Sequence, residues 1–327
     1  MTAAVLIVNW NSAGHLASCL RALQAQRRKP DRIIVVDNGS TDGSLDLASH
    51  WLQHATLIRL NVNVGFAKAN NIAAAAVRDV DALALLNPDA EADAGWLEAL
   101  IAAAETRPDV GCFASRMLMA STPALLDGAG DGYHVSGRAW RIGHRTAARD
   151  WPSGDTDVFG PCAAAALYRR EAFEEAGGFD EGYFCYFEDV DLAFRLRLRG
   201  HACLCVHSAV VRHVGSASTG YRSDFAVYHG ERNAVWTFVK NMPAPLFWLY
   251  LPQHILLNAV SLLYYPCRGQ GRVVLRAKVD ALRGLPRALR DRAAIQAGRR
   301  VEASALRKTL SRGALAPYLR RYTRRVP

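Results

Sequence analysis

The chain has 327 residues, of which 50% are hydrophobic and 21% charged, and its mean hydropathy is close to zero. These are ordinary globular values, and they exclude wholesale disorder, collagen and a polytopic membrane protein. The seven cysteines are odd in number and form no C-x-x-C pair, which predicts reduced thiols in a cytosolic protein. The segment MTAAVLIVNW lacks a basic n-region and a cleavage site, so no signal peptide is expected.

The net charge of +10 is unevenly distributed along the chain. From Arg268 to the end there are 17 Lys and Arg against 3 Asp and Glu, whereas residues 1–267 hold 23 against 27. A mildly acidic body is therefore followed by a strongly basic tail, and the two parts are expected to have different partners. We predict two domains, 1–225 and a helical, apolar and basic extension over 226–327.

Apolar runs alternate with helical patterns in the first half of the chain. The predicted strands cover 4–8, 33–36, 57–60 and 82–86, and helices are expected between them, including one over 67–77. Strands separated by helices indicate right-handed crossovers and a parallel sheet covered on both faces. The sequence therefore predicts an α/β fold with a Rossmann-like, mostly parallel sheet flanked by helices.

Polar residues follow three of these strands, at the sheet edge where parallel sheets bind ligands. They are Asn9, Asp37, Asn38, Asn87 and Asp89. A single Asp after a strand is usually a turn or cap residue. Two carboxylates and several amides at one edge favour a polar ligand or a cation.

Eight segments of the chain, in order between about residues 3 and 220, carry a resemblance to a known family. They read V-L-I-V-N-W-N-S, I-I-V-V-D-N-G-S-T-D, N-V-G-F-A-K-A-N-N, L-L-N-P-D, G-P-C-A-A-A-A-L-Y-R-R-E, G-G-F-D-E, F-E-D-V-D-L-A-F-R and V-V-R-H-V-G-S-A-S. Together they resemble family 2 glycosyltransferases of the GT-A fold, in particular the bacterial rhamnosyltransferase-like branch that builds surface polysaccharides. The resemblance implies that residues 1–225 form a GT-A catalytic domain.

The resemblance also implies a metal site. Family members usually carry Asp-x-Asp where this chain has Asn87-Pro88-Asp89, so Asp89 becomes the expected ligand of Mg²⁺ or Mn²⁺ and Asn87 a donor contact. In relatives a His at the position of His213 completes the metal shell. The cation is needed because the leaving nucleoside diphosphate gains negative charge. The structural alternatives are a strand-end turn at Asp89 and a hydrogen-bonded core histidine.

Further donor contacts are implied at Asn9, Asp37, Asn38 and Asn70. Asp37 and Asn38 resemble the pair that reads the nucleobase, and the Asn at position 38 leaves the choice between dTDP- and UDP-linked donors open. Asn70 follows Gly65-Phe66 in a loop that the resemblance places beside the donor. Turn and cap roles for these residues stay open as alternatives.

Glu188 and Asp189 are the expected catalytic pair. They begin a helix predicted over 188–199, with acidic residues first and arginines last, which the helix dipole alone would favour. The resemblance implies that Asp189 accepts the proton of the acceptor hydroxyl and that Glu188 supports it. The aromatics Tyr183, Phe184 and Tyr186 are expected either beneath an acceptor sugar or in the core.

The apolar, aromatic segment 244–265 is interrupted by Pro245 and Pro252, and we expect no unbroken run of the roughly 18–20 residues that a spanning helix needs. Arg283, Arg287 and Arg290 follow at helical spacing. An apolar segment beside a basic one predicts contact with an anionic membrane surface. The alternatives are a hairpin packed on the body or on a dimer partner, so a homo-oligomer stays open, and nucleic acid is not expected.

These inferences combine into one expected function. The chain is predicted to be an inverting glycosyltransferase that moves a sugar, with rhamnose as the first candidate, from a dTDP- or UDP-linked donor to a glycan or polyprenyl-linked acceptor. It is expected to act peripherally on the cytosolic face of the inner membrane, in cell-surface polysaccharide synthesis. A nucleotidyltransferase on a similar scaffold and a non-catalytic scaffold protein are the alternatives.

Overall fold

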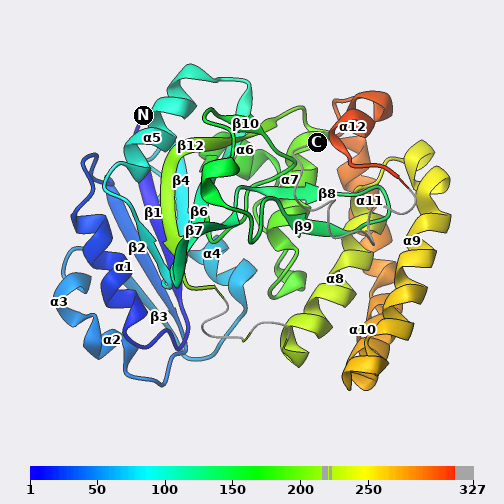
Figure 1. The fold of residues 1–327 in the computed structure, drawn as a ribbon, viewed down its shortest axis with the longest axis horizontal. Coiled ribbons are helices and arrows are strands. Elements are labelled where there is room, and N and C mark those ends of the chain that lie inside the picture. The colour runs from blue at the N-terminus through cyan, green and yellow to red at the C-terminus, as the bar shows by residue number, and fades with distance from the viewer. Residues whose placement is uncertain (216–219, 221–222, 314–327) are drawn as a thin grey trace.

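The computed structural model describes residues 1–215, 220 and 223–313 of the chain. A large sheet with helices on both faces occupies one side of the molecule, and helices α8–α12 form a bundle on the other (Figure 1). Residues 216–218 of the last resembling segment and the last four arginines of the basic tail lie outside the described residues.

The strands, in chain order, are β1 Ala3–Asn9, β2 Arg32–Asn38, β3 Thr56–Leu60, β4 Ala82–Leu86, β5 Ala90–Ala92, β6 Val110–Met119, β7 Thr122–Gly128, β8 Asp131–Tyr133, β9 Ala139–Arg141, β10 Thr156–Asp157, β11 Ala165–Arg169 and β12 Ala202–His213. The α-helices are α1 His15–Gln24, α2 Ser44–Leu47, α3 Ser49–Leu52, α4 Phe66–Ala75, α5 Trp96–Thr106, α6 Arg170–Glu175, α7 Glu188–Leu198, α8 Asp224–Asn241, α9 Ala244–Tyr264, α10 Gly271–Arg283, α11 Leu285–Ala297 and α12 Ala303–Thr309. All four predicted strands, and the helices expected over 67–77 and 188–199, are present.

The first four strands pair in parallel, in the order β4-β1-β2-β3. Every residue of β1 is buried, and alternate residues belong to different cores: Val5 and Ile7 pack on one face, Leu6 and Val8 on the other. A parallel strand that is covered on both faces needs apolar residues at consecutive positions, without the alternation of apolar and polar residues seen in half-exposed strands. Its polar end, Asn9, lies at the carboxyl edge of the sheet.

The rest of the sheet is mixed. β11 lies between β4 and β6 and is antiparallel to both, while β12 is parallel to β6 and antiparallel to the short β5. The chain passes from β6 to β11 without an α-helix, and a strand that returns without a crossover helix pairs antiparallel. The expectation of a mostly parallel sheet therefore describes β1–β4 and the β6-β12 pair, and not the strands around β11.

Three apolar cores hold these layers together. The first joins one face of the sheet to α1 and α5, and the second joins the other face to α4, α6 and α7. The third joins α7, through Val190 and Phe194, to the bundle residues Phe238, Leu246 and Tyr250. Helix α7 thus lies between the sheet and the bundle. All seven cysteines are free.

Helix α9 differs from the sequence expectation. It continues for 21 residues from Ala244 to Tyr264, with Pro252 inside it. Pro252 is exposed, so its missing N–H removes a backbone hydrogen bond on the outer side of the helix rather than in the core. By length and composition the segment Ala244–Arg268 is long and apolar enough to cross a membrane, and 22% of an apolar 18-residue stretch within it is buried inside the protein.

Candidate active site

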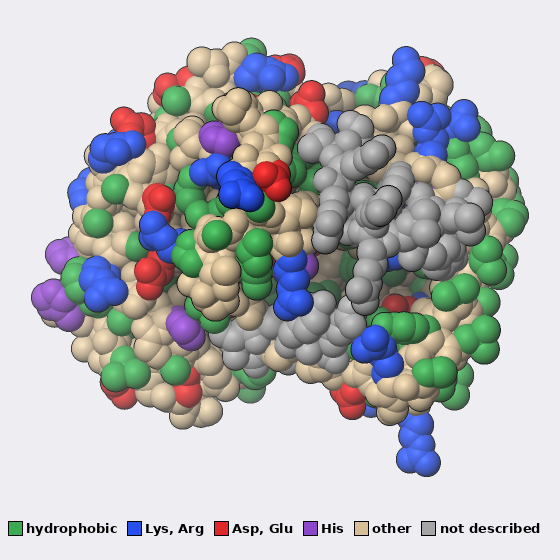
Figure 2. Space-filling view, in the orientation of Figure 1, with side chains coloured by type: hydrophobic (Ala, Val, Ile, Leu, Met, Phe, Trp, Pro, Cys, Tyr) green, Lys and Arg blue, Asp and Glu red, His purple; other side chains and the backbone are tan. Residues whose placement is uncertain are grey.

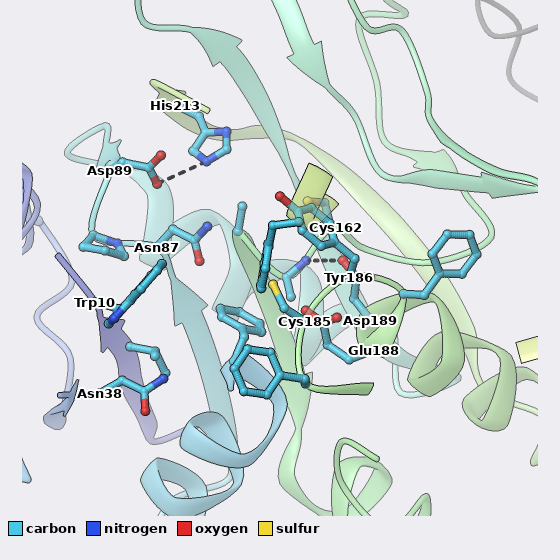
Figure 3. A pocket seen from close by; sticks show the side chains of 18 of the residues that line it. Trp10, Asn38, Asn87, Asp89, Cys162, Cys185, Tyr186, Glu188, Asp189 and His213 are labelled. Carbon is cyan, nitrogen blue, oxygen red and sulfur yellow. Dashed lines mark hydrogen bonds and ion pairs between the residues drawn. The ribbon is translucent and has the colours of Figure 1, made fainter. Parts of the chain in front are cut away.

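A cavity of about 240 Å³ lies at the carboxyl ends of β1 and β4, between the sheet and the first turn of α7. Its polar and sulfur-bearing lining comes from segments far apart in the chain. These residues are Asn38, Asn63, Asn87, Asp89, Arg141, Cys162, Cys185, Glu188, Asp189 and His213. Figure 3 shows Asp89 and His213 together on one side of this cavity and Glu188 and Asp189 on the other. The predicted metal pair and the predicted acid pair therefore line one cavity.

The pairing of β12 with β5 places His213 opposite Ala90, directly after the Asn87-Pro88-Asp89 turn. His213 Nε2 lies 3.3 Å from Asp89 Oδ1 (Figure 3), and Nδ1 donates to Asp127 Oδ2 at 2.7 Å. Burial lowers the pKa of His213, but the two carboxylates outweigh it and raise that pKa to about 9. The nitrogen and the oxygen that face each other here are both suitable ligands of a divalent cation.

Asp127 is a site residue that the sequence interpretation missed. It is buried and accepts a hydrogen bond from Arg141 Nη1 at 2.5 Å. Burial raises the pKa of its carboxyl, but hydrogen bonds with His144 and His213 and the charge of Arg141 hold it well below the usual range. Because a carboxylate only accepts, Asp127 keeps the proton of His213 on Nδ1 and turns Nε2 toward Asp89.

The available sequence signal was the glycine-rich run Asp-Gly-Ala-Gly-Asp-Gly at 127–132. A Cβ on Gly128 would lie 2.1 Å from Arg141 Cγ. Glycine at this position therefore lets the Arg141 side chain cross β7 and reach Asp127. No local pattern ties Arg141 to the run, because it arrives from β9.

Asp189 is partly exposed to the cavity. Its Oδ2 accepts from the backbone N–H of Ala163 at 3.1 Å, and its Oδ1 from that of Val190 at 2.8 Å. Burial raises the pKa of this carboxyl and outweighs the two hydrogen bonds and the charge of Arg141, which lower it. The two N–H donors fix the orientation of the carboxylate, as a general base requires.

Glu188 is buried, and its Oε2 has no hydrogen-bond partner among the described residues. Burial, and then the charge of Asp189, raise the pKa of Glu188 well above its usual range. Because two backbone N–H groups donate to Asp189 and none of the described residues donates to Glu188 Oε2, Asp189 is the better placed carboxyl of this pair to carry the negative charge of a base.

A second group of possible cation ligands includes the predicted base, Asp189. Oxygens of Asp131 and Asp189 and the Cys162 Sγ lie within 4.8 Å of one another. Arg141 Nη2 already donates to Cys162 Sγ at 3.4 Å, and burial raises the pKa of that thiol. Burial and the charge of Asp189 also raise the pKa of Asp131. A protonated thiol beside a guanidinium is a poor cation ligand, so Asp89 and His213 are the better pair.

The predicted donor residues divide into two groups. Asn87 and Asn38 line the cavity, and Asn38 is held by hydrogen bonds from its Nδ2 to Asn63 Oδ1 at 2.9 Å and from the Val64 N–H to its Oδ1 at 2.9 Å. Asn9, Asp37 and Asn70 are buried and do not line it.

The polar atoms of the second group bond inside the protein. Asn9 Nδ2 donates to Asp37 Oδ1 at 2.8 Å and to Ser44 Oγ at 2.9 Å. Asn70 Nδ2 donates to the Phe66 carbonyl one helical turn earlier. The donor roles of Asn9, Asp37 and Asn70 stay predictions, and the structure gives each a structural role.

The aromatic residues before α7 also divide. Phe184 and Tyr186 line the cavity, together with Trp10 and Phe225, which the sequence interpretation did not single out. Tyr183 is fully buried, and its hydroxyl donates to Asp191 Oδ1. Its place is therefore in the core.

The segment leading into α7 has a strained backbone. Phe184, Tyr186 and Phe187 have φ between 65° and 68°, a region that costs non-glycine residues about 1–3 kcal/mol each. Asn233 of α8 is fully buried, and its Nδ2 donates to the carbonyls of Tyr183, Cys185 and Tyr186 at 2.7–3.0 Å. The bundle thus holds the backbone that positions the acid pair.

We expect Asn233→Ala to lower the transfer rate on the order of 100-fold, because a small displacement of a catalytic group is this costly. It should also lower the free energy of unfolding by about 2 kcal/mol through the unpaired carbonyls. Steady-state kinetics and urea unfolding measure the two effects. Asn258→Ala is the matched control, since the hydrogen bonds that Asn258 makes with described residues all stay within α9. Unchanged turnover in a folded Asn233→Ala protein would contradict this role.

Comparison with known proteins agrees with the site. Residues 4–177 match the model of "Glycosyl transferase family 2". An N-acetylglucosaminyl-diphospho-decaprenol L-rhamnosyltransferase of Mycobacterium tuberculosis is 30% identical over 293 residues, covering 78% of this chain and 92% of that protein. The O-antigen chain rhamnosyltransferase RfbN of Salmonella typhimurium is 27% identical over 219 residues, covering 65% of this chain and 66% of that protein.

Solved structures share the fold at low identity. GalNAc-T7, crystallised with UDP, GalNAc and Mn²⁺, matches with a TM-score of 0.61 and 17% identity over 78% of this chain and 49% of that one. The mannosyltransferase PcManGT of Pyrobaculum calidifontis, in complex with GDP-Man and Mn²⁺, matches with a TM-score of 0.54 and 18% identity over 98% of this chain and 81% of that one. These likenesses confirm the predicted GT-A fold. Together with the family match and the rhamnosyltransferase relatives, they confirm the predicted resemblance: the chain belongs to glycosyl transferase family 2 and is a glycosyltransferase.

Proposed function

We propose that this glycosyltransferase inverts the anomeric centre of its donor sugar, with Asp189 as the base. The observation that carries the proposal is the single cavity lined by Asp89 and His213 on one side and by Asp189 on the other. Asp189 would take the proton of the acceptor hydroxyl as its oxygen attacks the anomeric carbon. Burial and the charge of Asp189 raise the pKa of Glu188 and favour its protonated form, which would donate a hydrogen bond to the acceptor.

We propose Asp89 and His213 as the ligands of a divalent cation, Mg²⁺ or Mn²⁺. The residues fit such an ion, because the buried Nε2 of His213 makes no hydrogen bond within the described part of the chain and lies beside a carboxylate oxygen. When bound, the cation would neutralise charge on the departing diphosphate. Asn87 and Asn38 would bind the donor nucleotide from the same rim.

The proposed substrates follow the relatives. Both are rhamnosyltransferases, and the name of one includes a decaprenol-linked acceptor. Rhamnose from a dTDP- or UDP-linked donor is therefore the first candidate, and a glycan or polyprenyl-linked molecule is the proposed acceptor. Such an acceptor would place the enzyme on the cytosolic face of the inner membrane, with residues 226–327 contacting the anionic surface.

Thermal stabilisation of the purified protein tests this proposal. A panel of nucleoside diphosphates and nucleotide sugars is added with and without Mg²⁺ or Mn²⁺. One nucleoside diphosphate should raise the melting temperature only when the cation is present, since a ligand at 100 times its Kd stabilises by about 2.7 kcal/mol. Stabilisation by triphosphates alone would favour the nucleotidyltransferase, and no stabilisation by any nucleotide would favour a non-catalytic scaffold.

We expect His213→Ala to abolish the cation-dependent part of this stabilisation, because it removes one of the two proposed ligands. Binding of the cation alone, measured by calorimetry, should weaken in parallel. His54→Ala is the matched control, since His54 is exposed just before the first residue of β3 and does not line the cavity. A His213→Ala protein with wild-type cation affinity would remove His213 from the metal site.

A further inference from the structure

Exposed apolar side chains gather on the helical bundle. The described part of the chain exposes 14 large hydrophobic residues, and 11 of them lie between Trp248 and Leu289. The three others, Leu47, Val62 and Val214, are scattered over the catalytic body. Figure 2 shows hydrophobic side chains along the edge where Figure 1 places α9. A concentration of this kind marks an interaction surface.

Helix α9 contributes a continuous stripe. Its exposed residues recur every three or four positions and carry no charge: Ala244, Pro245, Trp248, Leu249, Pro252, Ile255, Leu256, Ala259, Leu262, Leu263 and Tyr264. Trp248 is 70% exposed and Leu263 75%. A surface helix in water normally turns polar residues outward, so this stripe is built for an apolar environment.

The opposite face of α9 is committed to the protein. Leu246, Tyr250 and His254 are buried in the core that the bundle shares with α7. The His254 ring stacks on Phe238 with centroids 4.0 Å apart, and its Nδ1 bonds to the Ser136 carbonyl at 2.8 Å. A helix that crossed a bilayer would have to abandon these contacts. One face of α9 therefore packs against the protein, and the other face is apolar and exposed.

The neighbouring helix α10 adds positive charge. It packs beside α9 and exposes Leu275, Val279 and Leu282 among the arginines 272, 276 and 283. Between residues 268 and 313 the chain holds 13 Lys and Arg against 3 Asp and Glu. Apolar residues interleaved with arginines match a surface that is anionic outside and apolar beneath, which is a phospholipid monolayer.

A second copy of the chain fits this surface less well. In a two-fold symmetric dimer the same patch meets itself, so its arginines would approach one another. The one acidic residue of α10, Asp280, is partly exposed and pairs with Arg276 and Arg283, so one carboxylate faces three exposed arginines and the patch keeps a net positive charge. The charge of the patch therefore favours an anionic lipid partner over self-association.

We propose that α9 lies in the plane of an anionic membrane, with the stripe from Trp248 to Leu263 inserted between the headgroups and the arginines of α10 contacting lipid phosphates. The inference rests on the proposed function in one respect: the proposed function explains why the enzyme would be at the membrane, namely to reach a lipid-linked acceptor. The binding itself follows from α9 and α10. It names the residues that contact lipid and assigns α9 an orientation along the surface rather than across it.

Flotation of the full-length protein with lipid vesicles tests binding. The protein should float with vesicles that contain equal amounts of phosphatidylglycerol and phosphatidylcholine, and much less with phosphatidylcholine alone. The double variant Leu256→Glu with Leu263→Glu should weaken this binding by a factor on the order of 100. The matched control, Leu47→Glu with Val62→Glu, should bind like wild type. Wild-type protein that does not float, or a stripe variant that binds normally, would overturn the proposal.

The charge contribution has its own test. Arg272→Gln should weaken binding to the anionic vesicles about fivefold, whereas Arg78→Gln, an exposed arginine on the body, should have no effect. Equal loss in both variants would mean that net charge, and not the α10 surface, attracts the membrane. That result would also overturn the proposal.

Quenching by brominated lipids tests the orientation. The variant Leu256→Trp places an indole near the middle of α9, and its added fluorescence should be quenched by bromines near the headgroup end of the acyl chain and not by those near its terminus, because a helix in the membrane plane keeps its midpoint shallow. Quenching of the reverse order would mean that α9 spans the bilayer. Sedimentation equilibrium completes the set, since a dimer dissociated by the Leu256→Glu, Leu263→Glu variant would assign the stripe to a second copy.

These outcomes are separable from failure of the proposed function. Side chains on the stripe are exposed, so its variants should melt like wild type and should transfer sugar normally to a water-soluble acceptor without vesicles. If the wild-type protein transferred no sugar to a water-soluble acceptor, that result would count against the proposed function. Vesicle binding would still stand or fall by its own measurements.

Discussion

The substitution Asp189→Asn is expected to lower sugar transfer by about 100- to 10,000-fold, the usual contribution of a general base. Asparagine keeps the shape of the side chain, and its Oδ1 can still accept one of the hydrogen bonds from Ala163 or Val190. It cannot take a proton from the acceptor. Donor binding, measured by the cation-dependent thermal shift, should be unchanged because the donor side of the cavity is untouched.

Glu188→Gln is the informative comparison. Glutamine has the shape of the protonated carboxyl and can also donate a hydrogen bond, so transfer should fall by about tenfold or less, in the range of a single neutral hydrogen bond. If Glu188→Gln were inactive and Asp189→Asn active, the two roles would have to be exchanged. Kinetics of both variants with the same donor and acceptor decide the matter.

The second large effect concerns stability, and its centre is Asp191. This carboxylate is fully buried in α7 and bonds Arg195 Nε at 2.8 Å and Asn241 Nδ2 at 2.7 Å, with Lys240 Nζ at 3.1 Å. Asp191→Ala should lower the free energy of unfolding by about 3–5 kcal/mol, because two buried cations lose their shared partner. Urea unfolding measures the change.

A surface pair provides the control. Arg32 and Asp79 form an exposed ion pair at 3.1 Å, and Asp79→Ala should cost less than about 1 kcal/mol. Equal effects of the two substitutions would show that burial of the Asp191 network contributes nothing. Because Lys240 and Asn241 belong to α8, loss of this network should also loosen the bundle from α7.

Acid should weaken this contribution. Burial raises the pKa of Asp191, but Lys240, Arg195 and Asn241 outweigh it and hold that pKa well below the ordinary value of about 4. A group with a lowered folded-state pKa stabilises the protein above its unfolded-state pKa, and the stabilisation is lost as the pH falls below it. The stability difference between wild type and Asp191→Asn should therefore shrink between about pH 5 and pH 3. A constant difference would contradict the cause given.

Residues close together in sequence were predicted best. The buried strand β1, the acidic first turn of α7 and the Asn87-Pro88-Asp89 turn each carry their signal within about ten residues, because strand burial, helix charge and turn chemistry are local. The ordered motifs then indicated the family and, through it, the pairing of Asp89 with His213. The boundary at residue 225 stays a prediction, and contacts from α8 to α7 make the two parts depend on each other.

Contacts between distant segments were not predictable in this way. Asp127 lies 86 residues from His213, and Asn233 lies about 50 residues from the carbonyls it holds. Neither has a local pattern that names its partner. Asn9 and Asp37 show the converse, since each follows a strand as a ligand residue would, yet their polar atoms bond to each other and to nearby serines.

The linear order of residues was enough to specify the α/β layers, the family and the residues that line the two ends of the candidate cavity, since these depend on local burial patterns and short motifs. Only the folded chain decided which side chains orient His213, what supports the strained turn before Glu188, and which face of α9 is left exposed. Each of these depends on where a second element packs, and packing between segments far apart in the chain is a property of the whole fold.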